Sequence, residues 1–394
     1  MRRSSTLLLA VATFALAGCT AASGVVSGFA SPSAGSGAGP GPNSEDDAKE
    51  ADLSARVTIA GSGDLLSHAA VLRSAQQYAG AAGGYNFAPM FAQVAPILKK
   101  ADLAICHMET PLTSTNTRLT QSGILVFNTP HEIADAIRTT GWEGCDFASN
   151  HTWDQGLAGL ADTISVFKAA KIAYAGAGAT AQQPQIVAHY SANGLRIAQF
   201  GYSYTVYNDW GPNTTLPKEA PWMGESLWPA TGAEGILRDA KQAKADGADV
   251  VVISLHWGNQ YETEPNADQV ALAKKLLASP DVDLILGTHV HVVQPCEQIN
   301  GKFVFYGLGN FLSNQSPQVD ATLRPETQEG MIAEVTLDRD EAGKITQAAN
   351  YLPTKVNLVG HVVEPATART NPVTFDRVTK TLASRGCKLT PITP

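Results

Sequence analysis

The sequence predicts an α/β protein assembled from β-α units. The main observation is a set of five short apolar runs, rich in β-branched residues, at residues 57–60, 102–106, 145–149, 249–255 and 283–287. Runs of this length and composition are typical of buried strands. Helical patterns lie between them, and Asp, Glu, Asn or His stands at the end of every run.

The intervening helices are indicated by apolar residues at intervals of three and four. Leu157, Leu160, Ile164 and Phe167 follow this spacing, and residues 236–247 repeat it before the next strand. Near the carboxyl end, residues 331–337 and 345–358 predict a hairpin with a turn at 341–343. A helix is expected within residues 367–389.

The amino-terminal residues 1–19 resemble a lipoprotein signal peptide. Arg2 and Arg3 precede an apolar stretch, and the small residues before Cys19 resemble a lipobox. We therefore expect lipid on Cys19 to attach the protein to a membrane. The alternative is an ordinary secretory signal with a chance cysteine. Residues 20–55 are rich in Ala, Ser, Gly and Pro, and this composition predicts a disordered tether.

The remaining chain is expected to form one domain. Residues 56–340 show no shift in composition, and residues 341–394, with the hairpin and the helix, should complete the same domain. The net charge of −8 and the absence of basic clusters argue against nucleic acid as a partner. The sequence leaves the oligomeric state open.

Four cysteines follow Cys19 in the chain. If any of them pair, we expect a disulfide between Cys296 and Cys387. Cys106 and Cys145 lie in apolar runs on two predicted strands, and we expect them to stay reduced because parallel neighbours rarely offer disulfide geometry.

The polar residues at the strand ends predict one shared site. Ligands bind at the carboxyl ends of strands in open α/β sheets, so the five ends should converge in one crevice. His289 and His291 would share a face if their strand continued through them. Imidazoles with carboxylates and an amide suit a divalent transition metal, and manganese, iron and zinc all stay open.

Six motifs in order resemble those of a known family. They are Gly63-Asp64, ADLAICHMETPLT at 101–113, SNHTWDQG at 149–156, HWG at 256–258, GTHVHVVQ at 287–294 and YGLGNF at 306–311. The set resembles the CapA (poly-γ-glutamate capsule synthesis) branch of the calcineurin-like metallophosphoesterases, over residues 56–340. The resemblance implies a four-layer sandwich of two mixed sheets flanked by helices.

The resemblance also implies roles for individual residues. The implied metal ligands are Asp64, Glu109, Asn150, His256, His289 and His291. His151 matches the histidine that contacts the leaving-group or phosphoryl oxygen, and Asp154 would orient it or serve only as an acid near a helix start. Trp257 and Asn310 are placed in the pocket, although the segment with Asn310 could equally be a structural loop.

The sequence departs from the family pattern at several positions. A second metal-binding histidine usually stands where this chain has Leu66, so either one or two ions are expected. His107, where the family usually has Asn, is two residues before Glu109 and could supply an additional ligand. It could also form only hydrogen bonds near the site. His68 is a third candidate, although its position favours a helix start or the surface.

Two hypotheses about function follow. The first is a metal-dependent hydrolase of the phosphoesterase type, lipid-anchored outside the cytoplasm, that acts on a phosphorylated small molecule or a cell-envelope polymer. The second is a tethered accessory protein without turnover that binds or exports a polyanionic envelope polymer. In both, the resemblance implies a role in the biosynthesis of capsule or another envelope polymer.

Overall fold

The computed structural model describes residues 54–209 and 211–394 and is organised around its first strand, β1 (Ala55–Leu65). β1 pairs in parallel with β2 (Leu103–Met108) and antiparallel with β15 (Glu329–Arg339). The other strands of this ten-stranded sheet are β5 (Gly144–Phe147), β6 (Ala173–Thr180), β7 (Gln183–Ile186), β14 (Asn310–Leu312), β16 (Ile345–Asn357), β17 (Val362–Pro365) and β18 (Thr390–Pro391).

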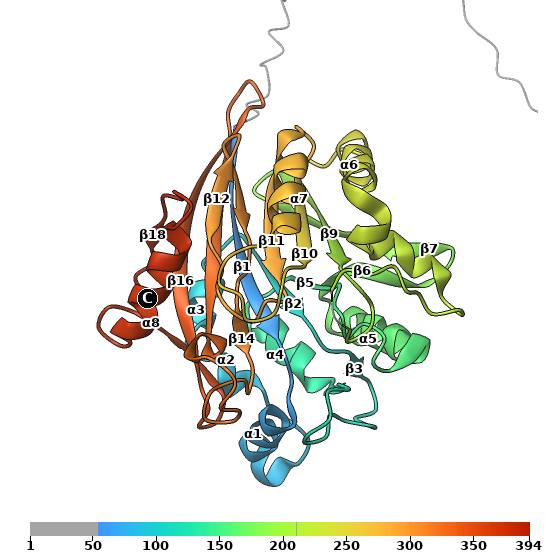
Figure 1. The fold of residues 1–394 in the computed structure, drawn as a ribbon, viewed down its shortest axis with the longest axis vertical. Coiled ribbons are helices and arrows are strands. Elements are labelled where there is room, and N and C mark those ends of the chain that lie inside the picture. The colour runs from blue at the N-terminus through green and yellow to red at the C-terminus, as the bar shows by residue number, and fades with distance from the viewer. Residues whose placement is uncertain (1–53, 210) are drawn as a thin grey trace, which may run out of the picture. The chain divides into compact units, whose positions relative to one another are not determined.

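A second sheet of six strands faces the first (Figure 1). Its order is β12-β13-β11-β10-β9-β8, in which β9, β10, β11 and β13 are parallel and the two edge strands are antiparallel. The bounds are β8 (Ala188–Ala192), β9 (Leu195–Ser203), β10 (Val250–His256), β11 (Leu284–Thr288), β12 (Cys296–Ile299) and β13 (Lys302–Phe305). A small separate ladder joins β3 (Leu112–Thr113) to β4 (Thr129–Pro130).

Helices cover the outer faces of both sheets. The first sheet is covered by α1 (Ala69–Ala79), α2 (Ala88–Phe91), α3 (Ala95–Leu98), α4 (Glu132–Thr140) and α5 (Gly156–Ala170). The second is covered by α6 (Trp228–Ala245) and α7 (Ala267–Ala278). Three short 3-10 helices span Gly80–Ala82, Pro221–Ser226 and Pro325–Gln328.

An apolar cluster fills the space between the sheets. Val57 and Ile105 contribute from the first sheet, and Val252 and Leu286 contribute from the second. Because alternate residues of a strand point to opposite faces, each sheet buries one face here and the other under its helices. The arrangement is therefore helix, sheet, sheet, helix, and it confirms the predicted four-layer sandwich of two mixed sheets.

Within the described residues, the carboxyl-terminal segment belongs to the same compact unit as the two sheets. β15 and β16 form the expected hairpin, which belongs to the sheet of β1. The helix that follows, α8 (Pro372–Ala383), is shorter than the segment 367–389 in which it was expected, and it packs against β16.

The predicted signal at residues 1–19, with Cys19, lies outside the described residues, as does the predicted tether up to residue 53. The described part continues the chain from Ser54, and Ala55 is already the first residue of β1. Within this part, every helix is too short or too polar to cross a membrane.

Two disulfides are present in the described chain. The Cys296–Cys387 bond, with a Cα separation of 5.6 Å, is the expected pair. The expectation that Cys106 and Cys145 stay reduced is wrong, because these residues also form a disulfide. They are direct register partners in the parallel strands β2 and β5, and their Cα separation of 4.4 Å falls within the range in which cysteines bridge.

Candidate metal centre

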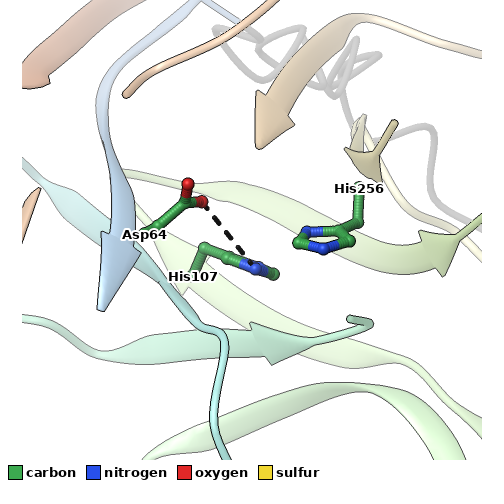
Figure 2. Close-up of side chains that lie close together, drawn as sticks. All are labelled: Asp64, His107 and His256. Atoms are coloured by element: carbon green, nitrogen blue, oxygen red, sulfur yellow. Dashed lines mark ion pairs between the residues drawn. The ribbon is translucent and has the colours of Figure 1, made fainter. Parts of the chain in front are cut away.

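Three buried donors lie at the carboxyl ends of strands. Asp64 is the residue before the last of β1, His107 is in β2, and His256 is the last residue of β10. Their ligand atoms all lie within 4.8 Å of one another. Figure 2 shows the His107 ring between the Asp64 carboxylate and the His256 ring. We call this group the strand trio.

His107 has one engaged nitrogen and one without a partner. Nδ1 lies 2.6 Å from Asp146 Oδ1 and Nε2 lies 4.0 Å from Asp64 Oδ1. Among the described residues, no group forms a hydrogen bond with Nε2. Burial disfavours the charged ring, but the carboxylates of Asp146 and Asp64 outweigh it and raise the pKa of His107 to about 9.

A second trio of donors lies on loops, and we call it the loop trio. Glu109 directly follows β2, and His289 and His291 follow β11. Their ligand atoms also lie within 4.8 Å of one another. Because β11 ends at Thr288 and both histidines have positive φ values of 87° and 59°, the strand does not continue through them.

The loop trio also holds polar atoms without partners. Within residues 54–209 and 211–394, neither carboxylate oxygen of Glu109 nor Nδ1 of His289 forms a hydrogen bond. Burial raises the pKa of Glu109. Both ring nitrogens of His291 face carboxylates. Nδ1 lies 3.1 Å from Asp64 Oδ2, and Nε2 lies 3.6 Å from Glu109 Oε1.

Asp64 and Asn150 connect the trios to their surroundings. The backbone N–H of His289 donates to Asp64 Oδ1 at 3.3 Å, so Asp64 contacts both groups. Asn150 Oδ1 lies 3.0 Å from His256 Nε2, and its amide donates to Asn208 Oδ1. Asn150 therefore adds an oxygen beside the strand trio.

His151 sits beside the donors rather than among them. Its Nδ1 lies 2.9 Å from Asp154 Oδ2, an oxygen that also accepts the backbone N–H of Phe127. The Phe127 ring meets the His151 ring edge-on, with 4.6 Å between centroids. Asp154 therefore contacts the ring of His151, as expected if it orients this histidine. It also lies shortly before α5, which begins at Gly156, as expected of an acid near a helix start.

A cavity of about 440 Å³ opens onto His151 and onto the two histidines of the loop trio. Its lining includes His151, His289 and His291 together with Leu66 and His68. His68 is the residue before α1, where its position in the sequence placed it. The rest of the lining is largely aromatic, amide and acidic, namely Leu125, Phe127, Tyr204, Asn208, Asp209, Gly211, Gly258, Asn259, Gln260, Tyr261, Glu262 and Gln315.

The two residues assigned to the pocket, Trp257 and Asn310, lie in different surroundings. Asn310 is at the site, where its Oδ1 lies 3.0 Å from His291 Nδ1. Trp257 is not among the lining residues; its indole donates to the carbonyl of Tyr306 within the cluster under α6 and α7. The YGLGNF segment packs directly against the backbone of Gly63. A Cβ atom at Gly63 would overlap the carbonyl oxygen of Gly309, so this position has room only for glycine.

The donor set fits divalent metal ions. Buried polar atoms are normally hydrogen-bonded, and here four nitrogen and oxygen atoms of Glu109, His107 and His289 are not. Imidazole nitrogens with carboxylate oxygens are ligands of zinc, manganese and iron. Two separate trios could hold one ion each.

Several residues around the site were not singled out from the sequence. Asp146, Asn208 and Tyr204 are the main ones, and they contact His107, Asn150 and the ring of His289 respectively. Asp146 could have been noticed as an acid within an apolar strand, since a buried carboxylate needs a partner. Nothing in the local sequence distinguishes Asn208 or Tyr204.

The fold and the site together define a two-sheet α/β protein with a candidate centre for divalent cations at its strand ends. The family described as "Bacterial capsule synthesis protein PGA_cap" matches residues 58–315. The chain belongs to this family.

Similar proteins with curated names include two from Bacillus. The chain is 31% identical over 228 residues to "Capsule biosynthesis protein CapA" of Bacillus anthracis, covering 57% of this chain and 54% of that protein. It is 28% identical over 227 residues to "PGA biosynthesis protein CapA" of Bacillus subtilis (strain 168), covering 57% of each. The chain thus spans about half the length of the curated relatives it matches.

Solved structures with some similarity include two bacterial proteins. One is the calcineurin-like phosphoesterase YfkN from Bacillus subtilis, with a TM-score of 0.42, 13% identity, and coverage of 84% of this chain and 97% of that chain. The other is a novel phosphatase from Mycoplasma pneumoniae, with a TM-score of 0.45, 13% identity, and coverage of 76% and 94%.

Proposed function

We propose that the protein is a metal-dependent hydrolase of the phosphoesterase type that acts outside the cytoplasm in the biosynthesis of capsule or another envelope polymer. The observation that carries the proposal is the pair of buried trios, with polar atoms of Glu109, His107 and His289 left without hydrogen bonds. Burying so many polar atoms without hydrogen bonds destabilises the folded protein unless these atoms bind a ligand.

The contacts indicate separate roles for the two trios and for His151. Two ions, held by the strand and loop trios with Asn150 beside them, would supply positive charge to phosphoryl oxygens and increase the acidity of a bound water. His151 would exchange a proton with the leaving group. Asp154 accepts from its Nδ1 side, and this leaves Nε2 for a molecule in the cavity that His151 lines.

The proposed location is supported by the sequence and by the disulfides. Disulfides persist mainly in oxidising compartments, and the described chain has two of them, Cys106–Cys145 and Cys296–Cys387. The lipobox-like residues before Cys19 support attachment to the membrane through lipid on that cysteine.

The substrate proposed is a phosphorylated small molecule or an envelope polymer. The relatives are named for capsule and PGA biosynthesis, which supports the envelope context. The cavity offers amides and rings for an organic group beside the trios, including Asn208, Asn259 and Tyr261.

The test is metal analysis combined with an activity screen. The purified protein, loaded with manganese, zinc or iron, is expected to bind two ions and to hydrolyse members of a panel of phosphomonoesters and phosphodiesters. Protein that retains no divalent metal would contradict the proposal. Protein that binds metal and an anionic polymer but hydrolyses nothing would support the second hypothesis, an accessory protein without turnover.

The charge of the cavity bears on that second hypothesis. Asp209 and Glu262 line the cavity, and none of its described lining residues is Lys or Arg. A polyanion held along its length would find no basic side chains to bind it, whereas a single phosphoryl group needs only the metal ions. For this reason hydrolysis is the function that we favour.

A further inference from the structure

Asp146 lies beside the candidate metal centre but belongs to neither trio. We propose that Asp146 is a positioning residue, whose carboxylate holds His107 so that Nε2 of the ring completes the strand trio. The inference rests on the proposed function, because it concerns the same centre.

The first step is the contact between the two side chains. His107 and Asp146 are register partners in the parallel strands β2 and β5, and Asp146 Oδ1 lies 2.6 Å from His107 Nδ1. A carboxylate accepts hydrogen bonds, so the ring donates its Nδ1–H. When a metal displaces the second ring proton, Nδ1 keeps its hydrogen bonded to Asp146 and Nε2 presents the lone pair that binds the ion.

The second step is the direction of Nε2. It lies 4.0 Å from Asp64 Oδ1, and the His107 and His256 rings are stacked with 4.9 Å between centroids. In the described chain Nε2 has no hydrogen-bond partner, although the residue is only 1% exposed. A histidine that served only to neutralise Asp146 would leave this orphaned nitrogen unexplained.

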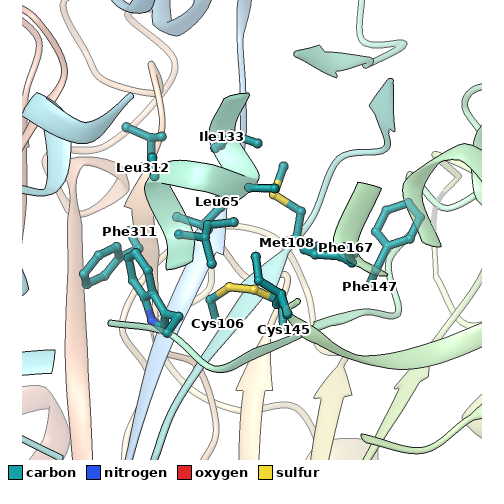
Figure 3. Packing of buried hydrophobic residues seen from close by; sticks show 14 of the residues in the cluster. Leu65, Cys106, Met108, Ile133, Cys145, Phe147, Phe167, Phe311 and Leu312 are labelled. Carbon is teal, nitrogen blue, oxygen red and sulfur yellow. A yellow bond between two sulfur atoms is a disulfide. The ribbon is translucent and has the colours of Figure 1, made fainter. Parts of the chain in front are cut away.

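The third step is the rigidity of the pair. The Cys106–Cys145 disulfide joins the residues immediately before His107 and Asp146, and Figure 3 shows it among apolar side chains that include Leu65 and Met108. Successive residues of a strand point to opposite faces, so the bond fixes the register from the other side of the sheet. On the near side, a Cβ at Gly201 of β9 would lie 3.2 Å from Asp146 Cβ, so β9 packs closely there.

Stability alone is a weak reason for this arrangement. A buried ion pair often contributes little net stability, because removing both charges from water offsets their attraction. Asp146 is only 3% exposed, and its contact with His107 is made at the edge of a cluster of metal-type donors. Orientation of a ligand accounts for both facts.

The test compares two carboxylates that each bond a histidine Nδ1. Asp146→Asn keeps the size of the side chain but removes its charge and replaces one of its two acceptor oxygens by a donor, so the proton is held less firmly on Nδ1. In the full-length protein, we expect this variant to weaken one of two Mn²⁺ dissociation constants by roughly 10–100-fold, measured by chelator competition. The matched control, Asp154→Asn, is expected to leave both constants unchanged.

Two further measurements separate positioning from a structural role. In protein loaded with Co²⁺, Asp146→Asn should change the visible absorption of one site, because a nitrogen ligand is lost or displaced. In a double-mutant cycle, Asp146→Asn should have no further effect on metal affinity when His107→Asn is already present.

The outcomes are distinct. Unchanged Mn²⁺ constants and an unchanged cobalt spectrum in Asp146→Asn would overturn the inference while the proposed function stands. If this variant does not fold, His107→Asn decides: wild-type affinity for both ions would overturn the inference. Wild-type protein that binds no divalent metal would remove the proposed function and this inference together.

Discussion

The strand trio and the loop trio differ in how the backbone presents their donors. Asp64, His107 and His256 lie within strands: Asp64 pairs with His107 after a shift in the β1–β2 register, and His256 ends the regular ladder of β9 and β10. His289 and His291 lie beyond the end of β11 and both have positive φ values, which non-glycine residues adopt only rarely. Such conformations cost of order 1–3 kcal/mol each when the surrounding structure does not favour them.

The strand trio and the loop trio are therefore stabilised in different ways. The strand trio is positioned by backbone hydrogen bonds that exist without any ligand. The loop histidines are held instead by contacts within the site, such as the bond from the His289 N–H to Asp64 and the bond from the Tyr261 N–H to the carbonyl of Val290. We therefore expect the loop trio to respond more strongly to the loss of metal.

The largest expected effect separates catalysis from metal binding. Substitution His151→Ala should lower kcat by roughly 10²–10⁴ because a general acid is lost, while both trios keep their metal. His289→Ala should lose metal from the loop trio. Steady-state kinetics with metal analysis of each variant checks this, and full activity in both variants would mean that the site is misassigned.

The two disulfides offer a way to loosen each trio separately. Cys106 is adjacent to His107, whereas Cys296 begins β12, directly after the loop that carries His289 and His291. Replacing either pair by alanine should cost about 2–4 kcal/mol of unfolding free energy. Hydrogen exchange should then increase in β2 and β5 for the first pair and in residues 289–295 for the second. Loosening of the same segment in both variants would contradict the assignment.

Removal of metal should affect the trios unequally. At free metal about 100-fold above the dissociation constant, one bound ion stabilises the folded protein by about 2.7 kcal/mol, and a chelator should abolish this. We expect the accompanying gain in hydrogen exchange to be greater at residues 289–295 than at the ends of β1 and β2. Equal protection in both segments after chelation would remove the distinction between the trios.

The smallest expected effect is a pH dependence that comes from neither trio. Burial, assisted by the charge of Arg73, lowers the pKa of His361 from 6.5 to about 4. The folded state disfavours protonation of His361, whereas the unfolded chain takes up this proton below about pH 6.5. The stability that depends on neutral His361 is therefore fully present above pH 6.5 and is lost as the pH falls toward 4. In metal-free protein, His361→Asn should lose less stability than wild type between about pH 7 and about pH 5, measured by urea denaturation. Asn tolerates the positive φ at this position.

The sequence predicted the strands and the donors at their ends because each depends on a local pattern. Asp64 and Glu109 follow apolar runs of the first sheet and His256 follows one of the second, so their convergence depends also on how the two sheets pack. The position of each donor at a strand end required no knowledge of long-range pairing. The same holds for the helix along residues 157–167, which the structure contains as part of α5.

What the sequence could not predict depends on register between distant segments. The alignment of β2 with β5 pairs Cys106 with Cys145 and His107 with Asp146, across 39 residues of chain. A disulfide and a hydrogen bond both follow from that alignment, and neither leaves a local signal. The loop after β11 is a similar case, since the direction of His289 and His291 depends on backbone angles that periodicity does not report.

The position of β1 has a consequence for the order in which the molecule can be built. Its antiparallel neighbour is β15, which begins only at Glu329, so one edge of the first strand stays unpaired until most of the chain has been synthesised. An unpaired edge is a site for misassembly with other chains. The residues of the centre are equally dispersed, from Asp64 in β1 to Asn310 in β14. The centre can therefore form only after most of the chain has been synthesised, and any truncation before β15 should yield a polypeptide that leaves one edge of β1 without its antiparallel partner.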